Sequence, residues 1–178
     1  MKAISPISSS NAAPSPLGEV GKHRMFFPSM CLGGRGFIYL SLGSNLGNRH
    51  ALLQQAIDLL SERVGVLKSV SSFLETEPWG FSSPHPFLNA CVLLQTELTP
   101  ARCLIETQKI EREMGRTQKS TDGQYHDRTI DIDILLYDDL HLDTLIYTPS
   151  GMQRLTIPHP LMEERDFVMI PLREILHT

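Results

Sequence analysis

The sequence predicts one domain of the α+β class, with strands and helices joined by polar turns. Three observations support this prediction. Residues 129–136 alternate strictly between two sets of side chains, which is typical of a half-buried strand. Residues 52–60 repeat apolar side chains at helical spacing, and Thr99 followed by Pro100 is a common helix start. At 178 residues, 41% hydrophobic and 20% charged, the chain can bury one core.

Composition argues against several classes of function. The formal net charge of −4 argues against a nucleic-acid binder that works by bulk electrostatics. No apolar run approaches the roughly 18 residues that a membrane helix needs. The three cysteines lack CxxC spacing, so neither a disulfide framework nor a zinc site is expected. We therefore expect a protein of the cytoplasm with no membrane partner.

Residues 1–36 differ in composition from the rest of the chain. They are rich in Ser, Pro, Gly and Ala and have neither a helical nor a strand period. We expect them to form a disordered N-terminal extension without an assigned function. The folded domain is expected to span residues 37–178.

The domain begins with an apolar run of strand length at residues 37–42. Turn residues at 43–48 stop this strand. The helical pattern that follows continues to about Val64 and ends near Gly65. Residues 66–75 are predicted to form a strand with a weaker pattern.

Residues 76–86 contain three prolines and a glycine, which predicts a loop. Its Trp79 either packs under the loop or covers a ligand. The next strand, residues 87–98, turns Phe87 and Asn89 away from the core. This face either binds a flat heterocycle by stacking and hydrogen bonding or is covered by a second layer of structure.

A second helix follows this strand. Thr99 is its expected N-cap, Pro100 its first residue and Gly115 its C′ residue. Gln108 and Glu111 fall on one stripe of this helix. From pattern alone, both side chains are expected to be solvated.

The strand at residues 129–136 carries the strongest chemical signal. Asp131 and Asp133 share the face opposite the apolar set, roughly 6–7 Å apart. Two such carboxylates suit a hard cation such as Mg²⁺, and nearby Arg128 suits a phosphate. The alternative is an exposed polar strand face. The apolar set, which we expect to face the core, is Ile130, Ile132, Ile134 and Leu136.

The remaining segments complete the element order. Residues 116–128 are predicted to form a functional polar loop, and residues 140–147 and 154–160 to be extended. An apolar segment ending at Leu176 is expected to close the core. The resulting order is that of a ferredoxin-like βαββαβ sandwich with extra C-terminal elements. Its helices would cover one sheet face and leave the other free for a site.

One group of motifs is specific to a family. Residues 128–135 read Arg-Thr-Ile-Asp-Ile-Asp-Ile-Leu, and Gly115 and Arg116 precede them. Leu-Gly-Ser-Asn-Leu-Gly at 42–47, Phe-Leu-Asn-Ala at 87–90 and Leu-Thr-Ile-Pro-His-Pro at 155–160 occur in the same order as in the family. Together these motifs resemble those of the 6-hydroxymethyl-7,8-dihydropterin pyrophosphokinases. The resemblance runs from about Phe37 to the C-terminus.

The resemblance implies a reaction and a metal site. Such enzymes transfer pyrophosphate from ATP to the hydroxymethyl oxygen of the pterin and release AMP, within folate biosynthesis. Asp131 and Asp133 match the residues that hold two Mg²⁺ ions, and Arg116 and Arg128 match the arginines that close over the phosphates. These four residues are the expected catalytic set.

The resemblance also implies two small-molecule sites, while oligomeric state, monomer or dimer, is left open. The expected pterin-binding residues are Thr76, Trp79, Phe87, Asn89, Tyr125 and Phe167. The expected ATP-binding residues are Gln108, Glu111, Arg128, Ile134, Arg154, Thr156, His159 and Arg165.

Two other classes of function are compatible with the pattern. One is another metal-dependent nucleotide transferase with an Asp-x-Asp pair, which would give Phe87 and Phe167 no special role. The other is a catalytically silent nucleotide-binding module, which would typically have lost an aspartate or Arg128.

Overall fold

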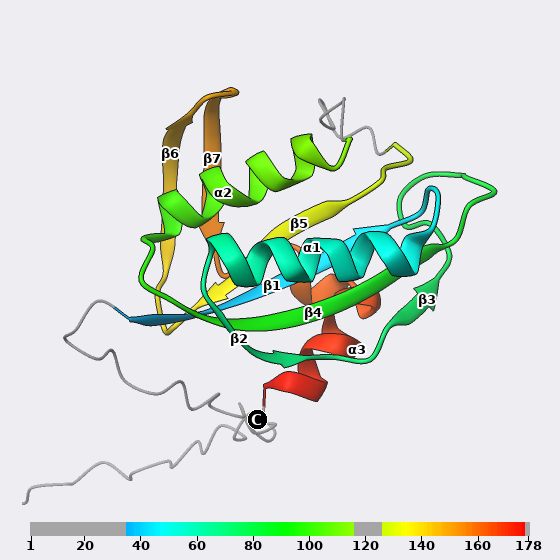
Figure 1. Cartoon of the computed structure of the whole chain (residues 1–178), viewed down its shortest axis with the longest axis horizontal. Coiled ribbons are helices and arrows are strands. Elements are labelled where there is room, and N and C mark those ends of the chain that lie inside the picture. The colour runs from blue at the N-terminus through cyan, green and yellow to red at the C-terminus, as the bar shows by residue number, and fades with distance from the viewer. Residues whose placement is uncertain (1–34, 116–125, 177–178) are drawn as a thin grey trace, which may run out of the picture.

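The structure, a computed structural model, describes residues 35–115 and 126–176. Within these ranges the chain forms a mixed α/β fold with antiparallel sheets and three α-helices (Figure 1). The elements are β1 (Gly36–Ser44), α1 (Arg49–Arg63), β2 (Val66–Val70), β3 (Leu74–Thr76), β4 (Phe87–Thr96), α2 (Pro100–Glu113), β5 (Asp131–Tyr137), β6 (Leu142–Thr148), β7 (Gly151–Ile157), a 3-10 helix (Met162–Glu164) and α3 (Asp166–Ile175). The expected N-terminal extension lies outside the described residues, apart from Arg35 and Gly36.

The main sheet has the strand order β2-β4-β1-β5, and β3 also pairs with β4. Every pairing in it is antiparallel. β6 and β7 form a separate two-stranded sheet. The two longest strands, β1 and β4, therefore form the middle of the main sheet, and β5 lies at one edge.

Helices α1 and α2 pack on one face of the main sheet, where the larger hydrophobic cluster lies (Figure 1). The Thr99 side chain caps α2 by accepting a hydrogen bond from the Arg102 N–H at 3.4 Å. Gly115 follows α2 with φ +91°, the left-handed conformation that favours glycine at C′. The predicted start and end of this helix are confirmed.

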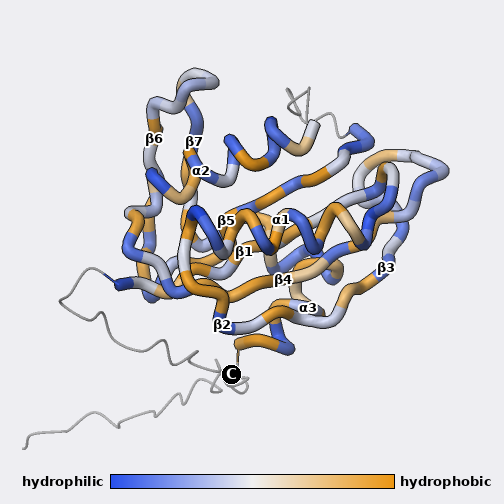
Figure 2. Tube along the Cα trace, in the orientation of Figure 1, coloured by the Kyte–Doolittle hydropathy of each residue, from blue (hydrophilic) through white to orange (hydrophobic). Residues whose placement is uncertain are grey.

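Helix α3 packs on the opposite face, against β4 and part of β1, over a second hydrophobic cluster that includes Cys91, Val168 and Leu172. Figure 2 shows the hydrophobic residues of α3 where it meets the sheet. The expectation that this face is wholly free is therefore wrong. The C-terminal segment does close a core, and it leaves only part of this face for a site.

A bulge breaks the alternation of β5. The pairing of β5 with β1 shifts between Tyr39 and Leu40, which face Leu136 and Ile134. Leu135 is the extra residue, and one inserted residue reverses the alternation that follows it. Leu136 is buried as predicted, but it packs in the second cluster beneath α3, so the prediction that it shares a face with Ile130, Ile132 and Ile134 is wrong.

Residues 66–75, predicted as one strand, form two. The break begins at Ser71, whose hydroxyl accepts a hydrogen bond from the Cys91 N–H at 2.9 Å. Ser72 is held by Glu174 of α3, which accepts hydrogen bonds from its N–H and hydroxyl at 2.6–2.8 Å. A side chain thus replaces one backbone partner of β4 and bends the edge of the sheet.

The β6–β7 hairpin lies beside α2 (Figure 1). Arg112 of α2 donates a hydrogen bond to the Ser150 hydroxyl in the hairpin turn at 2.6 Å. Before the hairpin, Asp138 turns the chain with φ 46° and accepts a hydrogen bond from the Phe37 N–H at 2.8 Å. In the described ranges no helix has the length and apolar character needed to cross a membrane.

Candidate active site

Three neighbouring strands form the floor of the candidate site. β1 lies between β4 and β5, and its Gly43 pairs with Asn89 on one side and Asp131 on the other. Two residues along the same strand, Ser41 pairs with Asp133. Since adjacent strands are about 4.8 Å apart, Asn89 and Asp131 lie about 10 Å apart across Gly43 of β1. The two polar strand faces identified in the sequence therefore share one side of the sheet.

Above this floor lies a pocket of about 530 Å³, its mouth included. It brings together most of the predicted pterin residues and the aspartate pair with two arginines. The lining residues are Ser41, Gly43, Thr76, Glu77, Trp79, Phe81, Phe87, Asn89, Arg128, Asp131, Asp133, Arg165 and Phe167.

One half of the pocket is aromatic. The Phe81 and Phe87 rings meet edge to face, with centroids 6.1 Å apart and an interplanar angle of 83°. The Trp79 and Phe167 rings lie 6.3 Å apart at 58°. Aromatic walls of this kind suit a flat heterocycle.

Asn89 supplies a polar group to the aromatic half. Its amide donates a hydrogen bond to the Thr76 hydroxyl at 2.9 Å and is almost fully buried. A Cβ atom at Gly43 would lie 3.1 Å from Asn89 Oδ1. Glycine at this position therefore leaves the Asn89 carbonyl oxygen room beside the pocket.

The other half of the pocket is charged. Arg128 forms an ion pair with Asp131, and Arg165 Nη1 lies 3.8 Å from Asp133 Oδ2. The arginine side chains are 9% and 8% exposed, whereas the aspartates are 23% and 40% exposed. The guanidinium groups thus lie deeper in the protein, and the carboxylates face the pocket opening.

The aspartate pair fits a metal that takes most of its ligands from elsewhere. In the described part of the chain, no group of three or more His, Cys, Asp or Glu side chains could hold a metal ion. Mg²⁺ is commonly bound by one or two carboxylates, with water and substrate phosphates completing six oxygen ligands. Asp131 and Asp133 match that donor set.

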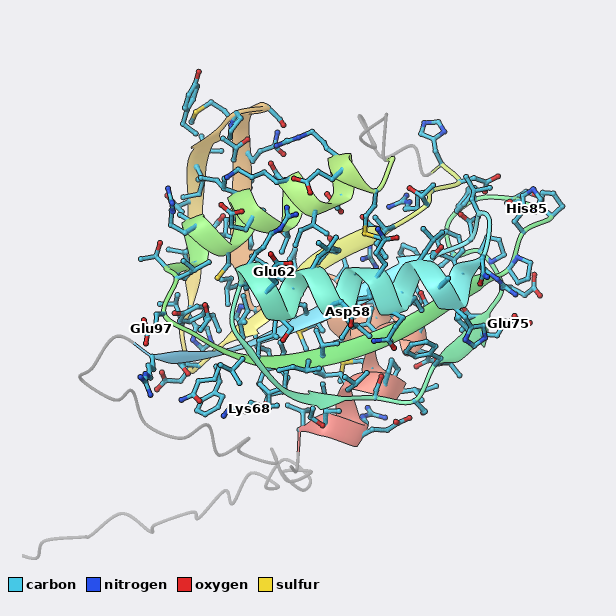
Figure 3. All side chains as sticks on the ribbon, viewed as in Figure 1. Asp58, Glu62, Lys68, Glu75, His85 and Glu97 are labelled. Atoms are coloured by element: carbon cyan, nitrogen blue, oxygen red, sulfur yellow. The ribbon has the colours of Figure 1, made fainter. Side chains whose placement is uncertain are left out.

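Asn45 holds the start of the aspartate strand in place. Its side-chain oxygen accepts a hydrogen bond from the Arg128 N–H, and its amide donates to Asp127 Oδ1, both at 2.7 Å. The same amide reaches the His85 carbonyl at 3.3 Å. Figure 3 places His85 at the end of the molecule where the β1–α1 turn lies. Hydrogen bonds, first from Ser83 and then from Asn45, lower the pKa of Asp127.

Gln108 and Glu111 are 7% and 5% exposed, so the expectation that they are solvated is wrong. The reason is that α2 lies along the outer edge of β5. Glu111 Oε1 accepts a hydrogen bond from the Ile132 N–H at 2.9 Å, between the two aspartates. Gln108 Oε1 has no hydrogen-bond partner among the described residues.

Arg154 and Thr156 lie on β7 and share one partner. Arg154 makes two hydrogen bonds to the Asp143 carboxylate, at 2.7 and 2.5 Å, and the Thr156 hydroxyl donates to it at 3.1 Å. These bonds lower the pKa of Asp143. The group is exposed on the hairpin, so the ion pair itself contributes little to stability.

His159 lies between the hairpin and the pocket. Its backbone N–H donates to the Leu135 carbonyl at 2.9 Å. Burial and, to a smaller extent, the positive charge of Arg165 lower the pKa of His159 from 6.5 to about 4, against the opposing effect of Asp131. The imidazole is therefore neutral near pH 7.

The predicted site residues fall into three groups. Most line the pocket described above. Arg116 and Tyr125 lie outside the described residues. Those that do not line the pocket, and belong to α2, β5, β7 and the segment after β7, are Gln108, Glu111, Ile134, Arg154, Thr156 and His159.

The pocket also contains residues that sequence reasoning missed: Ser41, Gly43, Glu77 and Phe81. β1 is buried along most of its length on both faces, so alternation gave no sign that Ser41 and Gly43 face a ligand site. Glu77 and Phe81 lie in a loop, where no periodic signal exists. Their position beside Trp79 was the one available indication.

The sequence matches a known family over most of its length. Residues 39–177 match the family model described as 7,8-dihydro-6-hydroxymethylpterin-pyrophosphokinase (HPPK). A 2-amino-4-hydroxy-6-hydroxymethyldihydropteridine pyrophosphokinase of Porphyromonas gingivalis is 56% identical over 138 residues, which cover 78% of this chain and 89% of that protein. The protein of the same name from Bacillus subtilis is 42% identical over 138 residues, covering 77% of this chain and 76% of that one.

Solved structures share the fold at low sequence identity. A crystal structure of HPPK-DHPS in complex with substrates superposes with a TM-score of 0.65 at 15% identity, over 80% of this chain. Wild-type HPPK-DHPS of Plasmodium falciparum with pterin and p-hydroxybenzoate gives a TM-score of 0.64 at 17% identity, also over 80% of this chain. In both cases the match spans 40% of the longer chain.

Proposed function

Since the chain belongs to the 7,8-dihydro-6-hydroxymethylpterin-pyrophosphokinase family, we propose that it catalyses that reaction of folate biosynthesis. The hydroxymethyl oxygen of 6-hydroxymethyl-7,8-dihydropterin forms a bond to the β-phosphorus of ATP. The bond from that phosphorus to the oxygen bridging to the α-phosphorus breaks, and AMP leaves. The observation that supports this function best is one pocket with an aromatic half and a carboxylate-guanidinium half.

The pterin binds in the aromatic half. Phe87 and Phe167 stack on the faces of its ring, and Asn89 with Thr76 hydrogen-bonds its polar edge. The hydrogen bond between Asn89 and Thr76 supports this role, because it fixes the amide before the substrate arrives. Trp79 closes the same half from the loop after β3.

Asp131 and Asp133 hold magnesium in the charged half. When bound, Mg²⁺ neutralises triphosphate charge and makes the β-phosphorus more electrophilic. Arg128 and Arg165 donate hydrogen bonds to phosphate oxygens, for which a planar guanidinium group is well suited. Positioning and electrostatic stabilisation then carry the rate, and no strong general base is required.

The nucleotide extends from the charged half around the edge of β5. Gln108 Oε1, buried and without a partner among the described residues, suits the exocyclic amine of adenine. Glu111 and the Ile134 backbone border the same edge. Arg154, Thr156 and His159 contact the ribose and phosphates. When the nucleotide binds, Arg154 and Thr156 give up their hydrogen bonds to Asp143 and donate to the ligand.

The fold proposed for this function is a ferredoxin-like sandwich. The strand order β2-β4-β1-β5 with two helices on one face supports it. The β6–β7 hairpin and α3 are additions to that core. We place the enzyme in the cytoplasm, where the free thiols of Cys91 and Cys103 stay reduced.

Product analysis tests this proposal. The protein is mixed with Mg-ATP, with and without 6-hydroxymethyl-7,8-dihydropterin, and nucleotides are separated by chromatography. AMP formed only in the presence of the pterin is the expected result. ADP instead would indicate an ordinary kinase, and AMP independent of the pterin another transferase. No turnover with intact nucleotide binding would favour the silent module.

A further inference from the structure

The Arg165 guanidinium lies against two aromatic rings of the pocket. Its central carbon lies 5.0 Å from the centroid of the Trp79 ring and 5.7 Å from that of Phe167. Both distances are within the range of a cation–π interaction, and such interactions are stronger when the cation is desolvated. Arg165 is only 7% exposed. The two rings therefore restrict where this guanidinium can lie.

The contacts of Arg165 join two parts of the site that lie on different elements. Arg165 is the residue before α3 and extends towards Asp133, with Nη1 3.8 Å from Oδ2. Trp79 belongs to the loop between β3 and β4, which also brings Glu77 and Phe81 to the pocket. A residue of the pterin side is thus in contact with a cation of the phosphate side.

We propose that the Trp79 indole is a positioning residue, which holds the Arg165 guanidinium for the triphosphate and so couples nucleotide binding to the pterin side of the pocket. This inference rests on the proposed function and adds a role for the Trp79 side chain. A flexible arginine loses conformational entropy when it binds phosphate, and a guanidinium held against two rings has already lost part of it.

The coupling is reciprocal. A pterin ring that binds against Phe167 changes the surroundings of Trp79, and Trp79 in turn changes those of Arg165. By linkage, if the pterin changes the affinity for the nucleotide by some factor, the nucleotide changes the affinity for the pterin by the same factor. A nucleotide that takes hydrogen bonds from Arg165 must also alter the environment of Trp79. Binding of the nucleotide alone should therefore change the environment of the Trp79 ring, although this residue lies on the pterin side.

Intrinsic fluorescence tests this directly, because Trp79 is the one tryptophan in the chain. Mg²⁺ with α,β-methylene-ATP is titrated into the protein without pterin. We expect a saturable change in Trp79 emission, which is lost in the Arg165→Lys variant because lysine lacks the planar guanidinium. An emission that does not respond to nucleotide, while calorimetry shows that the nucleotide binds, would overturn the inference.

Variants separate a positioning role from a pterin contact. Trp79→Ala should weaken binding of the ATP analogue, measured by calorimetry without pterin, by about five- to tenfold. Trp79→Phe, which keeps a ring, should restore most of that affinity. Phe81→Ala is the matched control: Phe81 lies on the same loop but packs edge-on against Phe87, so its loss should weaken pterin binding and spare the nucleotide.

The outcomes distinguish this inference from the proposed function. If Trp79→Ala weakens only pterin binding, the inference is wrong while pterin-dependent AMP formation stands. Melting temperatures of all variants identify any that fail to fold, and Trp79→Phe then carries the comparison. If wild-type protein forms no AMP but Trp79 still responds to nucleotide, the function fails and the coupling holds.

Discussion

Asp131 and Asp133 lie closer to solvent than the arginines they face. A buried guanidinium left without its carboxylate costs several kcal/mol, roughly 3–5. Truncating either aspartate to alanine would therefore mix a loss of stability with a loss of chemistry. Asparagine keeps the shape and an oxygen that can still accept a hydrogen bond from the arginine, and it removes the negative charge that a metal needs.

We expect Asp131→Asn and Asp133→Asn each to lower pterin-dependent AMP formation by about 10²-fold or more. The melting temperature should change by only a few degrees. Asp58→Asn is the control, because Asp58 lies on the exposed side of α1 and accepts a hydrogen bond from Gln54 (Figure 3). Wild-type rates in either test variant would remove the magnesium assignment.

His159 predicts a pH effect on stability. Its pKa is lowered to about 4 in the folded protein, against 6.5 for the unfolded chain. Protons therefore bind the unfolded state more readily, and the folded state loses stability as pH falls from about 6.5 to about 4. Above pH 6.5 the contribution is fully present.

The melting temperature of metal-free protein, measured between pH 7 and 4.5, should fall, and His159→Gln should reduce that fall. Asp127, Asp143 and Glu174 do not explain the same window. Their pKa values are lowered from 3.8, 3.8 and 4.5, so their stabilisation is lost at lower pH. An unchanged pH profile in His159→Gln would contradict the buried neutral imidazole.

Some of these residue roles could be read from sequence and others could not. The aspartate pair was found because alternation puts both carboxylates on one strand face, whatever the tertiary structure. Gln108 and Glu111 could not be found this way, because helical spacing says which residues share a stripe but not what covers it. Only the family resemblance indicated their importance.

At the scale of elements, Glu111 ties α2 to the edge of the sheet. The Ile132 N–H lies between Asp131 and Asp133 in the sequence and has the Glu111 carboxylate as its acceptor. An unsatisfied buried N–H costs about 1–3 kcal/mol. The hydrogen bond thus fixes the strand that carries Asp131 and Asp133, the proposed magnesium ligands.

Glu111→Leu should lower the free energy of unfolding by about 1–3 kcal/mol, measured in urea, and also lower the rate of AMP formation. Glu111→Gln is the matched control, since its amide oxygen can still accept the Ile132 N–H. It should retain most of the stability. If both variants lose equal stability, the negative charge rather than this hydrogen bond is what matters.

Element prediction succeeded where the signal is local. Both long helices have caps and apolar spacing within their own sequence, and β1, β4 and β5 were recognised from short runs. The break between β2 and β3 depends on Ser71 and on Glu174, about 100 residues away. The bulge at Leu135 depends on pairing with β1. Neither feature can be predicted from the residues next to it in the sequence, because each depends on a distant part of the chain.

At the scale of the whole molecule, the main sheet organises the site. The proposed pterin side is built on β4 and the proposed magnesium side on β5, and two small residues of β1, Ser41 and Gly43, separate them. Asn45 joins the end of β1 to Arg128 and to the loop that contains His85. In the proposed site the distance between the two substrates is therefore set by strand spacing, which varies little in folded proteins.

The proposed magnesium site has two carboxylates, and its other oxygen ligands must come from the nucleotide and water. A last prediction follows from this. In the proposed site Mg²⁺ needs oxygen ligands from the triphosphate, because the aspartate pair offers few donors, and the triphosphate needs the charge of Mg²⁺ to bind beside two carboxylates. Nucleotide should therefore stabilise the fold strongly only when magnesium is present. At about 100 times its dissociation constant, a ligand adds about 2.7 kcal/mol to the free energy of unfolding, or about 5–10 °C to the melting temperature of a chain of this size.

α,β-Methylene-ATP with Mg²⁺ should give this shift in a thermal melt, and addition of EDTA should remove most of it. Asp133→Asn should show a small shift with or without metal, because its pair is incomplete. An equal shift in EDTA would mean that the arginines alone bind the triphosphate, and the aspartates would then need another role.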